Sequence, residues 1–139
     1  MNKRIIIIVI TASILISASI YAICSRTQPT TPPLNITASL VSVLSRPDHF
    51  SEQNIFTEGV LFVDDNGCVS LYLSREHMEN GITKNAIYID KNNMSSDTLD
   101  ELKNLTGKYV IARGYFDAQN SGPENLYSGT LIIESFELS

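Results

Sequence analysis

Few residues in this chain have side chains that commonly carry out acid-base or nucleophilic chemistry. The chain contains two histidines, His49 and His77, and two cysteines, Cys24 and Cys68. A catalytic nucleophile needs a base within hydrogen-bond reach and a further group that orients the base. No Gly-x-Ser-x-Gly or Cys-His signature accompanies these residues. We therefore predict that the protein is not an enzyme and that it uses no cofactor.

Two short acidic runs have the donor atoms of a metal site but not the spacing. Glu76, His77 and Glu79 lie in an expected helical turn, where ligands on one face recur every third or fourth residue, and His77 is out of step with both glutamates. The run 64–66, Asp-Asp-Asn, lacks the length and the closing glutamate of a calcium loop. The sequence therefore predicts no metal site.

The first 25 residues have the composition of a membrane-targeting segment. Lys3 and Arg4 precede an uncharged run from residue 5 to residue 25, and Arg26 follows it. A helix of about 20 residues spans the roughly 30 Å hydrocarbon core of a bilayer. Because the more basic flank stays in the cytoplasm, we expect a single-pass anchor in the cytoplasmic membrane with the C-terminal domain in the periplasm.

Cleavage of this segment is an open alternative. The small residues 17–19, Ser-Ala-Ser, fit a signal-peptidase site, which would release a secreted protein. Lipidation at Cys24 is a further alternative, although Ile23 stands where a bacterial lipobox has a small residue. Residues 26–35, with prolines at 29, 32 and 33, read as a stiff spacer between the membrane and a domain at 36–139.

The domain reads as mainly β with short helices. Turn and alternation signals predict strands at 55–63, 69–74, 86–90, 108–117 and 130–138. We expect helical segments at 38–44, ended by Pro47, at 74–80, and after an N-cap at Ser95, with Gly107 ending the last of them. Three strands, a helix and two strands is the order of a five-stranded OB-fold barrel. A β-sandwich or an open α+β sheet would give a similar pattern.

A short resemblance accompanies this reading. Residues 71–76 (LYLSRE) and 81–90 (GITKNAIYID) resemble a group of small, uncharacterised bacterial exported proteins with a strand, a turn, Gly-x-x-Lys-Asn-Ala and a second strand. The resemblance covers these two runs alone. It implies a bacterial origin and an OB-like barrel, and it implies no known activity.

The charge of the domain limits its partners. Residues 36–139 carry fifteen acidic and seven basic side chains, so their formal net charge is about −8. Nucleic-acid binding depends on clustered Lys and Arg, and we do not expect a nucleic-acid partner. We expect a protein partner in the cell envelope, and an immunity-type protein that neutralises a basic toxin is one form of this hypothesis.

Strand alternation gives a second hypothesis. It predicts an inward-facing set on the strands: Val69, Leu71, Leu73, Ile87, Ile89, Val110, Ala112 and Phe116. It then places outward the residues that could form an aromatic and cationic platform for glycan or oligonucleotide: Tyr72, Tyr88, Arg113 and Tyr115. Exposed strand tyrosines are also favoured simply because they suit a pleated surface.

Two connecting loops are further places to look for binding. The first, residues 81–85, contains Lys84 and Asn85, the most distinctive pair of the resemblance. Alternatively, Asn85 closes a turn and Lys84 is solvated. The second is the loop at 120–127. We expect Cys68, beside an apolar run, to be buried and unreactive.

Overall fold

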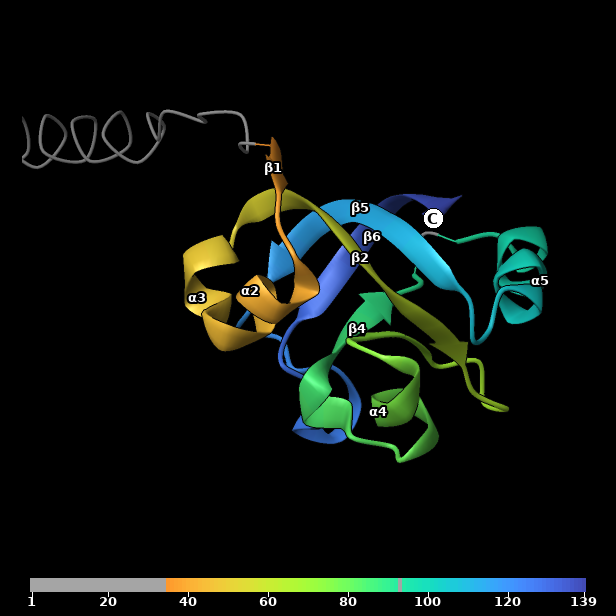
Figure 1. Ribbon diagram of the computed structural model, residues 1–139. Coiled ribbons are helices and arrows are strands. Elements are labelled where there is room, and N and C mark those ends of the chain that lie inside the picture. Colours follow the sequence, from red (N-terminus) through yellow and green to blue (C-terminus); the bar gives the residue numbers. More distant parts are fainter. Residues whose placement is uncertain (1–34, 93) are drawn as a thin grey trace, which may run out of the picture. The chain divides into compact units, whose positions relative to one another are not determined.

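The computed structural model describes residues 35–92 and 94–139. The predicted targeting segment, 1–25, and the spacer up to residue 34 lie outside the described residues. No helix in the described part is long and apolar enough to span a bilayer. The elements in chain order (Figure 1) are β1 (Asn35–Thr37), α2 (Leu40–Ser45), α3 (Pro47–Phe50), β2 (Gln53–Val63), β3 (Val69–Tyr72), α4 (Arg75–Glu79), η1 (Thr83–Asn85), β4 (Ala86–Asp90), α5 (Ser96–Asn104), β5 (Tyr109–Asp117), η2 (Pro123–Asn125) and β6 (Thr130–Leu138).

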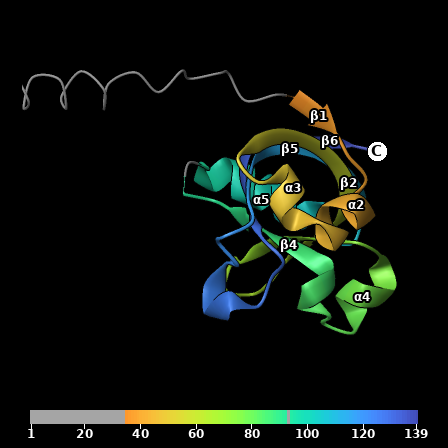
Figure 2. The ribbon, with the colours of Figure 1, turned by 90° about the vertical axis from the view of Figure 1, so that its left-hand side faces the viewer.

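Five of the strands close into a barrel. Their order is β2-β3-β4-β6-β5, and β5 pairs in turn with β2. The β4–β6 pair is parallel and the other pairs of the barrel are antiparallel. This order, with α5 inserted between β4 and β5, is that of the OB fold, so the predicted fold is confirmed. Figure 2 shows β2 and β5 curving together around the barrel.

The barrel closes because β2 is long and bent. Its residues 53–60 pair with β5, and its residues 60–63 pair with β3. Gly59 precedes Val60, where the two pairings meet, and a Cβ on Gly59 would come within 2.8 Å of the Tyr72 carbonyl oxygen. A glycine in a strand commonly marks such a corner, where another backbone approaches closely.

The core lies inside the barrel, as alternation predicted. Leu73 is partly buried, and the other residues of the predicted inward-facing set are fully buried: Val69, Leu71, Ile87, Ile89, Val110, Ala112 and Phe116. Leu102 of α5 and Leu40 and Val43 of α2 join the same cluster. Figure 1 shows α2 and α3 at one end of the barrel and α5 at the other.

The helices begin and end close to the capping residues that the sequence predicts. The Ser95 Oγ accepts a hydrogen bond from the Thr98 backbone N–H at 3.2 Å, which confirms the predicted N-cap of α5. At the other end, Gly107 has φ +81°, a value that glycine adopts readily. Pro47 follows the end of α2 as predicted, but it also begins α3, because proline suits the first turn of a helix.

One strand was not expected from the sequence. β1 pairs in parallel with β2, matching Ile36 with Ile55. The element is three residues long and polar at both ends, so it has no alternation that a sequence pattern could reveal. It brings the chain to the barrel at the outer edge of β2.

Replacing Gly114 by Ala tests the β5–β6 register. A register irregularity lies at Gly114, and a Cβ there would overlap the Ile132 carbonyl oxygen. We expect Gly114→Ala to lower the free energy of unfolding by about 1–3 kcal/mol, the usual range for overpacking. The control Ser135→Ala, at an exposed position of β6, should change it by less than about 0.5 kcal/mol. Equal denaturation midpoints for the two full-length variants would contradict this register.

Candidate binding site

A second apolar cluster lies on the outer face of β3 and β4. Its buried members are Val60, Tyr72, Ala86 and Tyr127, and its partly buried members are Phe62, Cys68, Met78 and Tyr88. These side chains lie outside the barrel core, on a face that an OB barrel usually leaves open. Here the face is covered, because the loop 118–129 folds back over it and brings Tyr127 with it.

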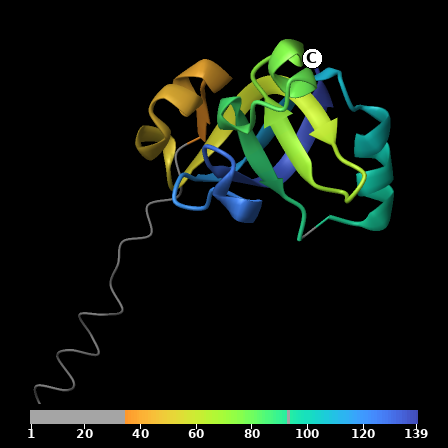
Figure 3. The same cartoon turned by 90° about the horizontal axis from the view of Figure 1, so that it is seen from below.

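Hydrogen bonds to the segment 84–86 hold this loop in place. The Lys84 ammonium donates to the carbonyl oxygens of Asn125, at 3.1 Å, and Tyr127, at 3.4 Å. Ser128 donates from its hydroxyl to the Lys84 carbonyl at 2.7 Å and from its backbone N–H to the Ala86 carbonyl at 3.1 Å. Figure 3 shows the loop, drawn in blue, beside β4, in green. These bonds therefore hold the loop 118–129 against the start of β4.

Close packing adds to these bonds. Gly122 has φ +66°, and a Cβ on it would come within 2.8 Å of the Tyr88 side chain. The rings of Tyr88 and Tyr127 pack with centroids 5.7 Å apart. A larger residue at 122 would separate the loop from β4, so glycine is required there both by its φ and by the space available.

Between this loop and the β2–β3 hairpin lies a pocket of about 410 Å³. Strand faces and loops in this position carry the ligand sites of OB folds. The pocket is lined by Asp64, Asn66, Cys68, Tyr88, Lys91, Pro123, Glu124, Leu126 and Tyr127. We call it the OB-face pocket.

The OB-face pocket has aromatic walls and acidic edges. Its charged lining residues are two carboxylates, those of Asp64 and Glu124, and one ammonium, that of Lys91. The Lys91 ammonium donates to the Gly67 carbonyl at 2.6 Å, and Asp64 Oδ1 accepts the N–H groups of Asn66 and Cys68 at 2.9 and 2.7 Å. These bonds fix the hairpin loop. Glu124 is exposed, so its carboxylate is available to a partner.

Burial alters the acidity of the tyrosines in this region. The pKa of Tyr127 is raised far above its ordinary value of 10.0, first by burial and then by the Cys68 thiol, whose Sγ lies 3.6 Å from the phenol oxygen. Burial also raises the pKa of Tyr72 and of Tyr88. The neutral forms of these three phenols therefore persist to higher pH than that of a solvated tyrosine.

The predicted four-residue platform does not form. Tyr72 is 3% exposed, inside the second apolar cluster, and Tyr88 forms part of the pocket wall. Arg113 and Tyr115 lie on β5, which is separated from β4 by β6. The prediction of a single exposed surface is wrong because strands β4 and β5 are neighbours in sequence order but not in the barrel.

The remaining predicted residues have structural contacts. Arg113 Nε lies 2.9 Å from Glu134 Oε2, and its guanidinium stacks over Phe56 at 4.9 Å. Tyr115 is half-buried, opposite Asn54 on β2. Asn85 closes a turn, since its N–H donates to the Ile82 carbonyl at 3.0 Å. Lys84 is exposed, and its ammonium also bonds the carbonyl oxygens of the loop.

Sequence reasoning missed most of the OB-face pocket. Asp64 and Asn66 belong to the run 64–66 that lacks the spacing of a calcium loop, and Lys91 and Glu124 carry no spacing signal. Tyr127 falls at the end of the loop 120–127 that was flagged as a place to look. Cys68 is half-buried, at the edge of the pocket, rather than fully buried as expected.

Comparison with known proteins adds little to this geometry. No family model matches the chain, and no curated protein matches it. A crystal structure described as an aspartyl-tRNA synthetase from Leishmania major Friedlin is similar in part, with 10% sequence identity and a TM-score of 0.47. The similarity covers 81% of this chain and 22% of that chain. The fold assignment rests on the strand order and pairing described above.

The raised Tyr127 pKa predicts a pH dependence of stability. A phenol whose pKa is higher in the folded state contributes stability below its unfolded value of about 10 and loses it as the pH rises further. We expect Tyr127→Phe to flatten the alkaline fall of the unfolding free energy by up to about 1.4 kcal/mol per pH unit. Chemical denaturation of the full chain between about pH 9 and 11 measures this.

The matched control is Tyr109→Phe, which removes a phenol that is 45% exposed. Its profile should run parallel to that of the parent protein. If Tyr127→Phe also runs parallel to the parent, the Tyr127 phenol is not held neutral by burial.

Proposed function

We propose that this protein is a non-enzymatic binding module of a bacterial cell envelope that captures a basic protein partner in the OB-face pocket. The proposal places the domain on the far side of the cytoplasmic membrane, tethered by or released from its N-terminal segment. The observation that carries the proposal is a pocket with two tyrosine walls and two carboxylates at the position where OB folds bind their ligands.

The chemistry of the pocket favours an Arg or Lys side chain. A cation over a tyrosine face gains about 0.5–2 kcal/mol, and the half-buried Tyr88 in the pocket wall offers such a face. A carboxylate such as that of Glu124 adds a charge-assisted hydrogen bond. The net charge of about −8 on residues 36–139 would speed the approach of a basic partner and select against acidic ones. An immunity-type role against a basic toxin is one specific form of this function.

The same charges disfavour nucleic acid. An OB fold that tracks a phosphate backbone lines its groove with Lys and Arg and stacks bases on exposed aromatic rings. In the OB-face pocket, Lys91 is already bonded to Gly67 and both neighbouring charges are negative. A polyanion would meet Asp64 and Glu124 first.

A cell-wall glycan is the second candidate ligand. The pair of packed tyrosines beside the Asn66 side chain favours it, because sugar rings lie on aromatic faces and amides bond their hydroxyl groups. The pocket volume of about 410 Å³ would hold a sugar ring as well as a side chain. A binding experiment with both probes distinguishes the two candidates.

Two small probes test the proposal on the full chain in a neutral detergent. We expect acetyl-Gly-Arg-Gly-amide to shift the NMR signals of the backbone amides of Asn66, Cys68 and Tyr127. We expect acetyl-Gly-Gly-Gly-amide and a soluble peptidoglycan disaccharide to leave them unchanged. Equal shifts from the two tripeptides, or no shift from the arginine tripeptide, would refute a basic partner at this pocket. Shifts from the disaccharide alone would support the glycan candidate instead.

Glu124→Gln provides the matched variant. Loss of one charge-assisted bond should weaken binding of the arginine tripeptide about threefold to tenfold. Glu79→Gln removes an equal charge from an exposed position of α4 and should leave binding unchanged. An equal effect of the two variants would mean that overall charge, rather than the pocket, attracts the peptide.

A further inference from the structure

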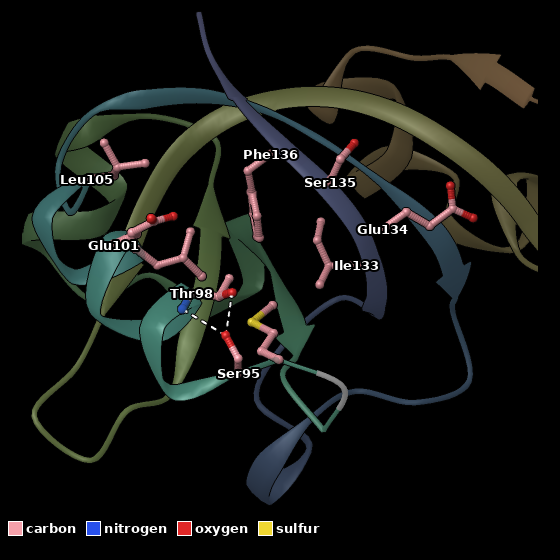
Figure 4. A pocket seen from close by; sticks show the side chains of 10 residues that line it. Ser95, Thr98, Glu101, Leu105, Ile133, Glu134, Ser135 and Phe136 are labelled. Carbon is pink, nitrogen blue, oxygen red and sulfur yellow. Dashed lines mark hydrogen bonds between the residues drawn. The ribbon is translucent and has the colours of Figure 1, made fainter.

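A second concave surface lies between α5 and the C-terminal half of β6, away from the OB-face pocket. Figure 4 shows Phe136 and Ile133 of β6 facing Thr98 and Glu101 of α5 across it. Its volume is about 440 Å³. We call it the α5–β6 groove, and it is lined by Met94, Ser95, Thr98, Glu101, Leu102, Leu105, Ile133, Glu134, Ser135 and Phe136.

One wall of the groove is an open strand edge. β4 pairs with residues 130–132 of β6, and among the described residues no strand pairs with the same side of residues 133–138. The Ser139 N–H donates to the Tyr109 carbonyl on β5 at 3.3 Å. Because hydrogen-bonding groups alternate along an antiparallel strand, Phe136 and Leu138 direct their N–H and C=O groups away from β5, to the open side. Such an edge is a template for an added strand.

The floor of the groove is apolar. Ile133 and Phe136 of β6 pack against the barrel core from one side, and Leu102 and Leu105 of α5 do so from the other. Leu138 is 61% exposed and follows Phe136 on the same face. An extended segment lying along β6 could place every second side chain on this apolar floor.

The rim of the groove is acidic. α5 and β6 together carry five acidic residues and one basic residue. The basic residue, Lys103, pairs with Asp100 at 3.1 Å, and Glu134 pairs with Arg113 at 2.9 Å. Glu101 and Glu137 form no ion pair within residues 35–92 and 94–139, so two carboxylates remain for a partner.

We propose that the α5–β6 groove binds an extended segment of a partner protein, which adds as a strand to the open edge of β6. The segment has apolar residues at alternate positions, for the floor, and Lys or Arg between them, for Glu101 and Glu137. Main-chain hydrogen bonds to Phe136 and Leu138 supply affinity and the alternate side chains supply specificity, as in other strand additions. This inference does not depend on the OB-face pocket.

A second copy of this chain is a poorer occupant. Antiparallel pairing of two β6 edges would bring Glu134 and Glu137 of each copy together along one surface. Like charges on neighbouring strands destabilise their pairing. The groove therefore suits a basic segment and selects against self-association.

A proline at position 138 tests the strand addition. Leu138→Pro removes an N–H that points to the open edge and leaves the β5 ladder intact, which proline tolerates on edge strands. Leu138→Ala shortens the same exposed side chain and keeps the N–H. The probe is the peptide acetyl-Lys-Val-Lys-Leu-Lys-Val-Lys-amide, titrated into the full chain in a neutral detergent. We expect Leu138→Pro to weaken its binding about tenfold relative to Leu138→Ala.

Three controls make the result decisive. The acidic peptide with Glu in place of each Lys should bind at least about tenfold more weakly to the parent protein. Glu101→Gln should weaken binding of the basic peptide, whereas Glu79→Gln on α4 should not. The Glu124→Gln variant of the OB-face pocket should bind the basic peptide like the parent, which separates this inference from the proposed function.

Several outcomes would overturn the inference. Equal affinities of Leu138→Pro and Leu138→Ala would show that the edge of β6 is not used. Equal binding of the acidic and basic peptides would show that the acidic rim of the groove does not select the partner. A dimer of the full chain that Leu138→Pro dissociates would make a second copy the occupant.

Discussion

Pairing of β2 with both β3 and β5 closes the barrel, and the position of every candidate surface depends on this closure. The two pairings meet at Val60, and the neighbouring Gly59 leaves room for the Tyr72 carbonyl. A closed barrel fixes which side chains are inside. It also places the β2–β3 hairpin loop and the loop 118–129 at the same side of β4, where together they line the OB-face pocket.

The outer face of β3 and β4 is the distinctive part of this barrel. The second apolar cluster around Tyr72 and Tyr127 gives the loop 118–129 an apolar surface to pack on, and the Lys84 ammonium satisfies two of its carbonyl groups. The loop can therefore be both long and ordered, and a partner that binds there meets a wall that is already formed.

Local rules predicted the elements well. β4 and β6 have the predicted bounds, and the Ser95 cap and the glycine at 107 mark the ends of the α5 region as expected. These features depend on side-chain alternation and on backbone groups within a few residues. The inward-facing set could be predicted for the same reason, because apolar and polar side chains alternate along a strand that buries one face.

Non-local contacts explain what the sequence did not reveal. β6 lies between β4 and β5 although it comes last in the chain, and this separated Arg113 and Tyr115 from Tyr88. Tyr72 points out of the barrel as alternation requires, yet the loop that buries it begins more than forty residues later. Lysine is usually solvated, and no local pattern predicts a partner for Lys84. Its ammonium has hydrogen-bond partners only because the loop 118–129 lies beside it.

Hydrogen exchange at the loop 118–129 tests the central claim, that this loop is a fixed wall of a binding site rather than a mobile connection. In the full chain, the Tyr127 N–H donates to the Ser121 carbonyl and the Ser128 N–H to the Ala86 carbonyl, both at 3.1 Å. The account predicts that these two amides exchange slowly, within about tenfold of the β4 amides. Exchange of both at the rate of an unstructured peptide would contradict it.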